Sequence, residues 1–165
     1  GVETAEGDFL YTEQMPSATL PRRQRQVSFD ELLGVQASRV LVVSPDHALK
    51  DFLEISEALG LSRVSYAVGL TTWFDIAPTG VTKASALEVL RARLGIDATR
   101  VFAAGDGEND IQMLHWAGKR GDSVAMGQAD PHVKAAAGRV TGTVFENGLL
   151  AALQERFPKL LAPVV

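Results

Sequence analysis

From residue 80 onward, short apolar segments alternate with segments of helical spacing, and this alternation restricts the possible folds more than any other feature of the chain. Strands that follow helices in this way pair in parallel through right-handed crossovers. The pattern therefore predicts an α/β fold with an open parallel sheet and helices on both faces. Strands are expected at 100–104, 123–126 and 139–141, and helices at 82–94, at 108–117, from Asp130 as N-cap with Pro131 at the first position, and at 145–156.

The first 80 residues predict a less regular arrangement. A strand is expected at Phe9–Tyr11 and another at 39–43, after which Ser44 and Pro45 begin a helix. Apolar residues at helical spacing extend that helix to about residue 59, and strands at 63–68 and 72–76 follow. The remainder of residues 1–38 shows weak periodicity, and its secondary structure stays open.

Composition excludes several classes of protein. A net charge of −4 argues against a broad nucleic-acid-binding surface, and the cluster of Arg22, Arg23 and Arg25 is interpreted as a solvated loop. The absence of cysteine excludes disulfides and thiolate metal sites. No apolar run reaches the roughly 18 residues of a membrane-spanning helix, so we expect no membrane partner and a cytoplasmic location.

The most informative segment is Gly105-Asp106-Gly107-Glu108-Asn109-Asp110, which lies between a predicted strand and a predicted helix. Loops at the carboxyl ends of parallel strands are where open α/β sheets bind ligands. Three carboxylates within five residues repel one another unless a cation or a positive dipole offsets their charge. Oxygen ligands of this kind suit Mg²⁺, which keeps several waters and binds few protein carboxylates. The alternative is that Glu108 and Asp110 stabilise a helix N-terminus while Asp106 serves the turn.

Lys83 stands at the predicted start of a helix, where its positive charge opposes the helix dipole. That position suggests a compensating anion, either a phosphate or Asp110. The alternative is an exposed lysine with no partner.

These motifs together resemble the Cof-type branch of the haloacid dehalogenase-like (HAD) phosphatases. The resemblance rests on three segments in order, Gly80-Val81-Thr82-Lys83, Gly105 to Asp110 with Met113-Leu114, and Val124-Ala125-Met126-Gly127. It covers the chain from about Arg39 to the C-terminus. It implies a Rossmann-like core, here residues 81–165, preceded by a partial α/β cap domain at residues 1–80.

The resemblance also implies the roles of the matching residues. Lys83 neutralises the phosphoryl group and the nucleophile, Asp106 ligates Mg²⁺, and Asn109 contacts phosphate or the surroundings of the metal. Asp110 supports catalysis by orienting Lys83 or a metal-bound water. The implied reaction is hydrolysis of small phosphorylated metabolites, such as sugar phosphates, through an aspartyl-phosphate intermediate.

Two positions depart from the family pattern. The Asp-x-Asp pair that supplies the nucleophile is absent from the sequence, and Asp46 is not a substitute because it begins a predicted helix in the cap. Gln128 stands where the family has asparagine. We therefore expect this chain to be the later part of a longer protein, inactive by itself, with its missing N-terminal part as a partner.

Two other functions fit the same motifs. One is a non-catalytic binding module that retains the fold, and the other is a phosphomutase-type transferase of the same superfamily. His47, His115 and His132 lack the spacing of metal ligands and are interpreted as structural or solvent-facing.

Overall fold

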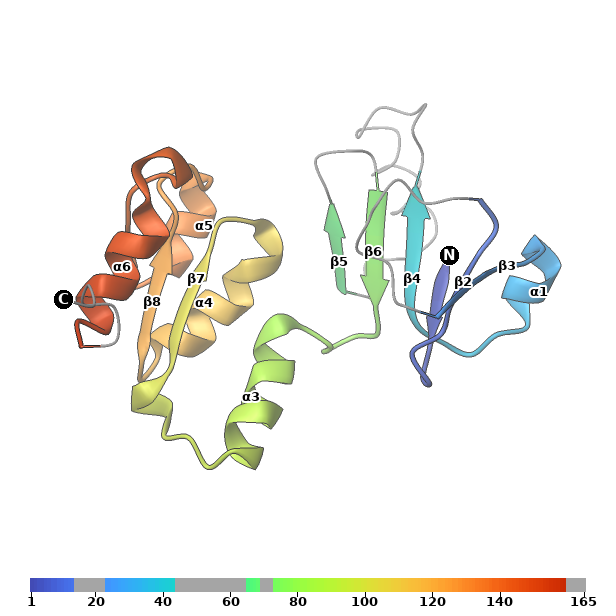
Figure 1. The fold of residues 1–165 in the computed structure, drawn as a ribbon, viewed down its shortest axis with the longest axis horizontal. Helices are drawn as coiled ribbons and strands as arrows, with labels where there is room; N and C mark the ends of the chain where they lie inside the picture. Colours follow the sequence, from blue (N-terminus) through green and yellow to red (C-terminus); the bar gives the residue numbers. More distant parts are fainter. Residues whose placement is uncertain (14–22, 44–64, 69–72, 160–165) are drawn as a thin grey trace. The chain divides into compact units, whose positions relative to one another are not determined.

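A computed structural model describes residues 1–13, 23–43, 65–68 and 73–159, with side chains left out at 65–68 and at Trp73 and Phe74 (Figure 1). The chain divides into two compact units, Gly1–Val81 and Thr82–Val165. Among the helices described, none is long and apolar enough to span a bilayer. The predicted helix at about 45–59, together with Asp46 and His47, lies outside the described residues.

The first unit contains a six-stranded sheet in the order β3-β2-β1-β4-β6-β5. All neighbouring pairs are antiparallel except β2 with β3. Its elements are β1 (Val2–Thr4), β2 (Phe9–Tyr11), β3 (Gln24–Gln26), α1 (Phe29–Leu33), β4 (Ala37–Val43), β5 (Ser65–Val68) and β6 (Trp73–Ala77).

Three of these elements were not predicted, namely β1, β3 and α1. Strand β3 is exposed along its whole length and consists of polar residues, so it carries no alternating pattern. The loop interpretation of the arginine cluster is wrong for Arg25, which lies in β3 and pairs with Glu31 at 2.8 Å. Arg22 lies outside the described residues.

Both faces of this sheet bury apolar side chains, and one of them also holds an ion pair. Val2, Leu10 and Val27 form a buried apolar cluster on one face, against which Val40 packs. Because side chains alternate along a strand, Arg39 points to the opposite face. There its guanidinium donates to both carboxylate oxygens of Asp75 at 2.6 and 2.5 Å. Strands β4 and β6 are therefore joined by a half-buried ion pair as well as by the backbone ladder.

The second unit contains a three-stranded parallel sheet in the order β7-β8-β9, in agreement with the predicted α/β class. In Figure 1 the arrows of β7 and β8 run side by side. The elements are α3 (Lys83–Arg93), β7 (Phe102–Gly105), α4 (Ile111–Gly118), β8 (Asp122–Ala125), α5 (Pro131–Ala136), β9 (Arg139–Val140) and α6 (Gly148–Arg156), with short 3-10 turns η2 (Ala98–Arg100), η3 (Glu108–Asp110) and η4 (Val144–Glu146).

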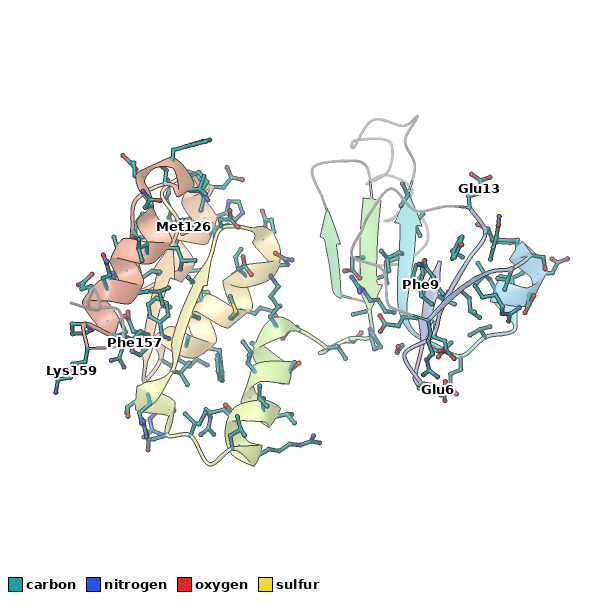
Figure 2. All side chains as sticks on the ribbon, viewed as in Figure 1. Glu6, Phe9, Glu13, Met126, Phe157 and Lys159 are labelled. Atoms are coloured by element: carbon teal, nitrogen blue, oxygen red, sulfur yellow. The ribbon has the colours of Figure 1, made fainter. Side chains whose placement is uncertain are left out.

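Helices cover both faces of this sheet, as the sequence predicted. On one face α4 packs against β7 and β8, and α5 packs against β8. On the other face Arg139 of β9 joins Asp122 of β8 to Glu155 of α6. Phe157, which follows α6, meets the ring of Phe102 edge to face at 5.8 Å. Figure 2 labels Phe157 and Met126 at opposite ends of this sheet, and Met126 marks the carboxyl end of β8.

The predicted boundaries hold to within a few residues, and the differences have local causes. The predicted helix at 108–117 begins as the 3-10 turn η3 before α4 continues it. Asp130 occupies the N-cap position of α5 and Pro131 its first turn, as predicted, but the Asp130 side chain makes no capping hydrogen bond. The last predicted helix is divided at Asn147, which adopts a left-handed conformation between η4 and α6.

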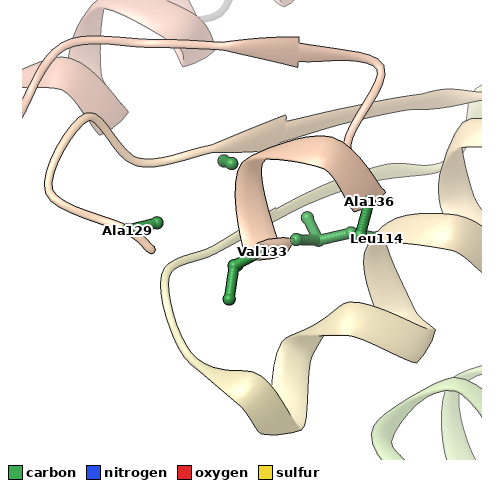
Figure 3. Close-up of a cluster of buried hydrophobic side chains, with 5 residues drawn as sticks. Leu114, Ala129, Val133 and Ala136 are labelled. Atoms are coloured by element: carbon green, nitrogen blue, oxygen red, sulfur yellow. The ribbon is translucent and has the colours of Figure 1, made fainter. Parts of the chain in front are cut away.

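Leu114 belongs to the apolar cluster between the sheet and its helices (Figure 3). It is fully buried and packs with Ala125, Val133 and Ala136. We expect Leu114→Ala to destabilise the protein by about 2–5 kcal/mol, because the small neighbours cannot fill the cavity. Urea unfolding measures this loss. Leu114→Met, which nearly conserves volume, should cost less than about 1.5 kcal/mol; equal losses in the two variants would show that packing at this position is not limiting.

Candidate active site

The turn after β7 brings the acidic motif to the carboxyl end of the sheet. Gly105 ends the strand directly over the Asp110 side chain, and a Cβ at Gly105 would lie 2.5 Å from the Cβ of Asp110. Glycine is therefore required at this position by close approach. The three carboxylates of the turn differ in solvent exposure. Asp106 and Glu108 face solvent, whereas Asp110 is only 6% exposed.

The buried Asp110 side chain stabilises this turn through hydrogen bonds. Its Oδ2 accepts hydrogen bonds from the backbone N–H groups of Asp106 at 3.0 Å and Gly107 at 3.1 Å. Its Oδ1 accepts from Lys83 Nζ at 2.5 Å. Burial by itself raises the pKa of this carboxyl, but the hydrogen bonds from Lys83, Gly107 and Asp106 and the charge of Lys83 outweigh burial and lower the pKa. Asp110 is therefore ionised, and both of its oxygens are engaged within the protein.

Lys83 reaches Asp110 because it is the first residue of α3. Thr82 caps the helix by accepting from Ser85 N, and the Ser85 hydroxyl accepts in return from Thr82 N. The Lys83 side chain is 48% exposed, so its ammonium contacts Asp110 while remaining open to solvent. Of the two sequence alternatives for this residue, the geometry matches the one with an anionic partner.

Asp106 presents a different environment. Its Oδ2 accepts a hydrogen bond from Gln128 Nε2 at 2.9 Å. Within the described part of the chain, no hydrogen bond reaches its Oδ1. Asp106 therefore has a carboxylate oxygen available to a ligand from solvent at the end of β7.

Glu108 and Asn109 complete the exposed rim of the turn. Glu108 Oε1 contacts His132 Nε2 of α5. Asn109 is exposed, and its Oδ1 lies over Gly107. His115 is exposed on α4. The structure thus brings Lys83, Asp106, Asn109 and Asp110 into one region, with His132 at its edge.

A second polar contact fixes α3 against α4. Glu88 of α3 accepts from Trp116 Nε1 of α4 at 2.9 Å and from Arg91 at 2.6 and 2.9 Å. The hydrogen bonds from Arg91 and then from Trp116 lower the pKa of Glu88 to about 2. Since Lys83 begins α3 and Asp110 immediately precedes α4, this contact helps to hold the two ends of the ion pair in place.

The low pKa of Glu88 predicts an acid-dependent loss of stability. A carboxyl with a depressed folded-state pKa stabilises the fold above its unfolded value near 4.5, and this contribution disappears as the pH falls toward 2. We expect Glu88→Gln to lower the melting temperature by a few degrees at pH 7 and by much less near pH 2. Thermal unfolding followed by circular dichroism at both pH values tests this. If Glu88→Gln lowered the melting temperature by the same amount at pH 2 and pH 7, the assignment of this stability to the Glu88 carboxylate would be wrong.

The oxygen donors fit one part of a magnesium site. Mg²⁺ is usually held by one or two carboxylates together with waters and phosphate oxygens. Asp106 Oδ1 provides one such oxygen, whereas both oxygens of Asp110 are already engaged. In the described ranges no three histidine, aspartate or glutamate side chains gather closely enough to hold a metal by themselves. Any complete site therefore needs further ligands.

Sequence reasoning missed two contacts. The sequence identified Gln128 only as a departure from the family pattern, although its side chain donates a hydrogen bond to Asp106. The contact between Glu88 and Trp116 spans 28 residues and was not predicted. The spacing of Glu88 and Arg91 signals a local helix pair, but nothing local to the sequence signals the tryptophan.

Comparisons with known proteins agree with this geometry. The family model of haloacid dehalogenase-like hydrolases matches residues 6–153. A phosphoglycolate phosphatase of Methanothermobacter thermautotrophicus is 31% identical over 134 residues, which cover 79% of this chain and 54% of the relative. A 5-amino-6-(5-phospho-D-ribitylamino)uracil phosphatase of Bacillus subtilis is 31% identical over 132 residues, which cover 77% of this chain and 47% of the relative.

A solved structure of an HAD subclass IIB sugar phosphatase has 26% sequence identity and a TM-score of 0.65, covering 82% of this chain and 49% of that one. The chain thus spans about half the length of these relatives. Since the family model covers most of the 165 residues, including the Asp106 turn and Lys83, the chain belongs to the haloacid dehalogenase-like hydrolases.

Proposed function

We propose that this chain supplies the later half of the active site of a magnesium-dependent phosphatase, which hydrolyses phosphate monoesters of small metabolites. The observation that carries the proposal is the difference in burial and hydrogen bonding between Asp106 and Asp110. Asp110 is buried and bound to Lys83, while Asp106 is exposed with a free carboxylate oxygen. Negative and positive groups at one sheet edge suit a metal and a phosphoryl group together.

Each residue has a role in this proposal. Asp106 holds the metal through its free oxygen. Lys83, oriented by Asp110, directs its ammonium at the charge of the phosphoryl group, and Asn109 contacts the phosphate from the rim of the turn. Mg²⁺, when bound, neutralises the phosphoryl oxygens and makes phosphorus easier to attack.

The attacking group in this proposal lies outside the 165 residues, because the sequence contains no Asp-x-Asp pair. An aspartate oxygen bonds to phosphorus, and the ester P–O bond breaks as a second aspartate gives its proton to the leaving alkoxide. That second aspartate then takes a proton from water, whose oxygen bonds to phosphorus and displaces the aspartate as inorganic phosphate forms. Lys83 stays protonated throughout and offsets the charge of both steps.

The names of the relatives support a phosphorylated metabolite as the substrate. A phosphoglycolate phosphatase, a phosphoribitylamino-uracil phosphatase and a sugar phosphatase all act on small molecules that carry a phosphate. The first unit of this chain, with its half-buried Arg39–Asp75 pair, is proposed to be part of a cap that selects among such substrates.

The test is an assay of the polypeptide encoded by the complete reading frame beside the 165-residue chain. We expect the complete polypeptide to hydrolyse p-nitrophenyl phosphate with Mg²⁺ and to lose this activity with EDTA. The 165-residue chain should stay inactive. Absence of hydrolysis in the complete polypeptide, across a panel of sugar phosphates, would favour a non-catalytic binding module. Appearance of isomeric hexose phosphates instead of free phosphate would identify a phosphomutase.

A further inference from the structure

The side chain of Gln128 joins two loops at the carboxyl end of the parallel sheet. Its Nε2 donates to Asp106 Oδ2 at 2.9 Å, and its Oε1 accepts from the backbone N–H of Val144 at 3.1 Å. Asp106 follows β7, whereas Val144 begins η4 after β9. One carboxamide therefore connects Asp106, the candidate metal ligand, to Val144, which lies 38 residues further along the chain.

The orientation of this amide is fixed by chemistry. A backbone N–H can only donate, so the amide oxygen of Gln128 must face Val144. The NH₂ group must then face Asp106, whose carboxylate can only accept. With its nitrogen directed at Asp106, Gln128 presents no lone pair there to a cation. It is suited to hold the carboxylate and unsuited to replace it as a ligand.

The backbone that carries Gln128 is held on both sides. Met126 N donates to Gly105 O at 2.9 Å, and Gly127 N donates to Gly142 O at 3.0 Å. A Cβ at Gly127 would lie 2.8 Å from Thr143 N, so the two loops are in direct contact at this point. Thr143 in turn is bound through its N–H and its hydroxyl to Glu146. The backbone from which the Gln128 side chain projects is therefore held in place by hydrogen bonds.

We propose that Gln128 is a positioning residue for Asp106, which sets the rotation of its carboxylate so that Oδ1 faces the incoming cation. This inference rests on the function proposed above. Asp106 is exposed and lacks the packing that would otherwise restrict its side chain. The donor on Oδ2 occupies one of its lone pairs and restrains the carboxylate, while Oδ1 keeps both of its lone pairs, so Asp106 is expected to bind the metal through Oδ1.

The expected effect is on metal affinity. Removing a hydrogen-bond partner of a metal ligand typically weakens binding about 10–100-fold. Gln128→Met keeps the length of the side chain and removes both hydrogen bonds. We expect the Mg²⁺ concentration for half-maximal activity to rise about tenfold, with kcat largely restored at saturating Mg²⁺, because the free carboxylate can still be captured at higher metal concentration.

The experiment compares wild type, Gln128→Met and Gln112→Met in the polypeptide encoded by the complete reading frame. Gln112 is exposed on α4, and in the described part of the chain its side chain makes no hydrogen bond, so its variant controls for the chemical change alone. Mn²⁺ affinity by electron paramagnetic resonance gives a readout independent of turnover. Hydrogen exchange at the Val144 amide, measured without metal, reports the bridge itself.

Support requires weaker Mn²⁺ binding in Gln128→Met alone, together with faster exchange at Val144. Unchanged Mn²⁺ affinity in Gln128→Met, with a wild type that binds Mn²⁺ through Asp106, would overturn the positioning role and leave the proposed phosphatase intact. A wild type that binds no Mn²⁺ would overturn both, and Val144 exchange would then show whether the bridge is only structural. A loss of melting temperature with no change in affinity would also count against positioning.

Discussion

Asp106→Asn should lower metal-dependent phosphate-ester hydrolysis by about 10³-fold or more. The substitution keeps the shape of the side chain and removes the charge of the carboxylate that directly follows β7 and has an unengaged Oδ1 among the described contacts. Charge stabilisation by a bound metal is worth several kcal/mol, and each 1.4 kcal/mol corresponds to about a factor of ten in rate. Steady-state hydrolysis of p-nitrophenyl phosphate across a Mg²⁺ titration measures the effect.

Stability should respond differently from activity in this variant. Asp106 is exposed and accepts one side-chain hydrogen bond, which asparagine can still accept from Gln128. We therefore expect the melting temperature without metal to stay close to that of wild type. Asp30→Asn, an exposed aspartate on α1, is the matched control and should leave activity unchanged. Retention of more than a tenth of the activity in Asp106→Asn would rule out its role as metal ligand.

Asp110→Ala should damage both activity and stability. It removes the acceptor of Lys83 Nζ and leaves the backbone N–H groups of Asp106 and Gly107 without their partner. Unpaired donors and a broken ion pair together cost about 2–4 kcal/mol, a figure that allows for the half-exposed Lys83. Displacement of Lys83 and of the turn should reduce kcat by about 10²-fold or more. Urea unfolding and steady-state kinetics measure the two effects.

Two milder variants separate the functions of Asp110. In Asp110→Asn the amide oxygen can still accept from the two backbone N–H groups, but the amide NH₂ faces the Lys83 ammonium. In Lys83→Met the carboxylate keeps its two backbone bonds and loses only the ammonium. Both should therefore lose activity with less loss of stability than Asp110→Ala. If Asp110→Asn were as unstable as Asp110→Ala, the turn bonds would not be what Asp110 contributes to the fold.

Local sequence signals predicted the second unit well because its elements follow one another through short connections. The short apolar run before Asp106, the Pro131 helix start and the helix after Lys83 each depend on neighbouring residues, and each lies within a few residues of its expected place. The first unit was harder, since β3 consists of polar exposed residues and is a strand only because β2 lies beside it. Its stability comes from a partner distant in sequence rather than from its own pattern.

The sequence by itself determined that this chain is an α/β protein and that an acid-rich turn follows a strand, because periodicity and glycine placement act over a few residues. Only the tertiary structure decided which aspartate is buried and which is exposed. It also decided that Lys83 pairs with Asp110 and that Gln128 holds Asp106, contacts that span 27 and 22 residues. The physical reason is that such contacts depend on how α3, β7 and β8 pack and align, which no local pattern encodes.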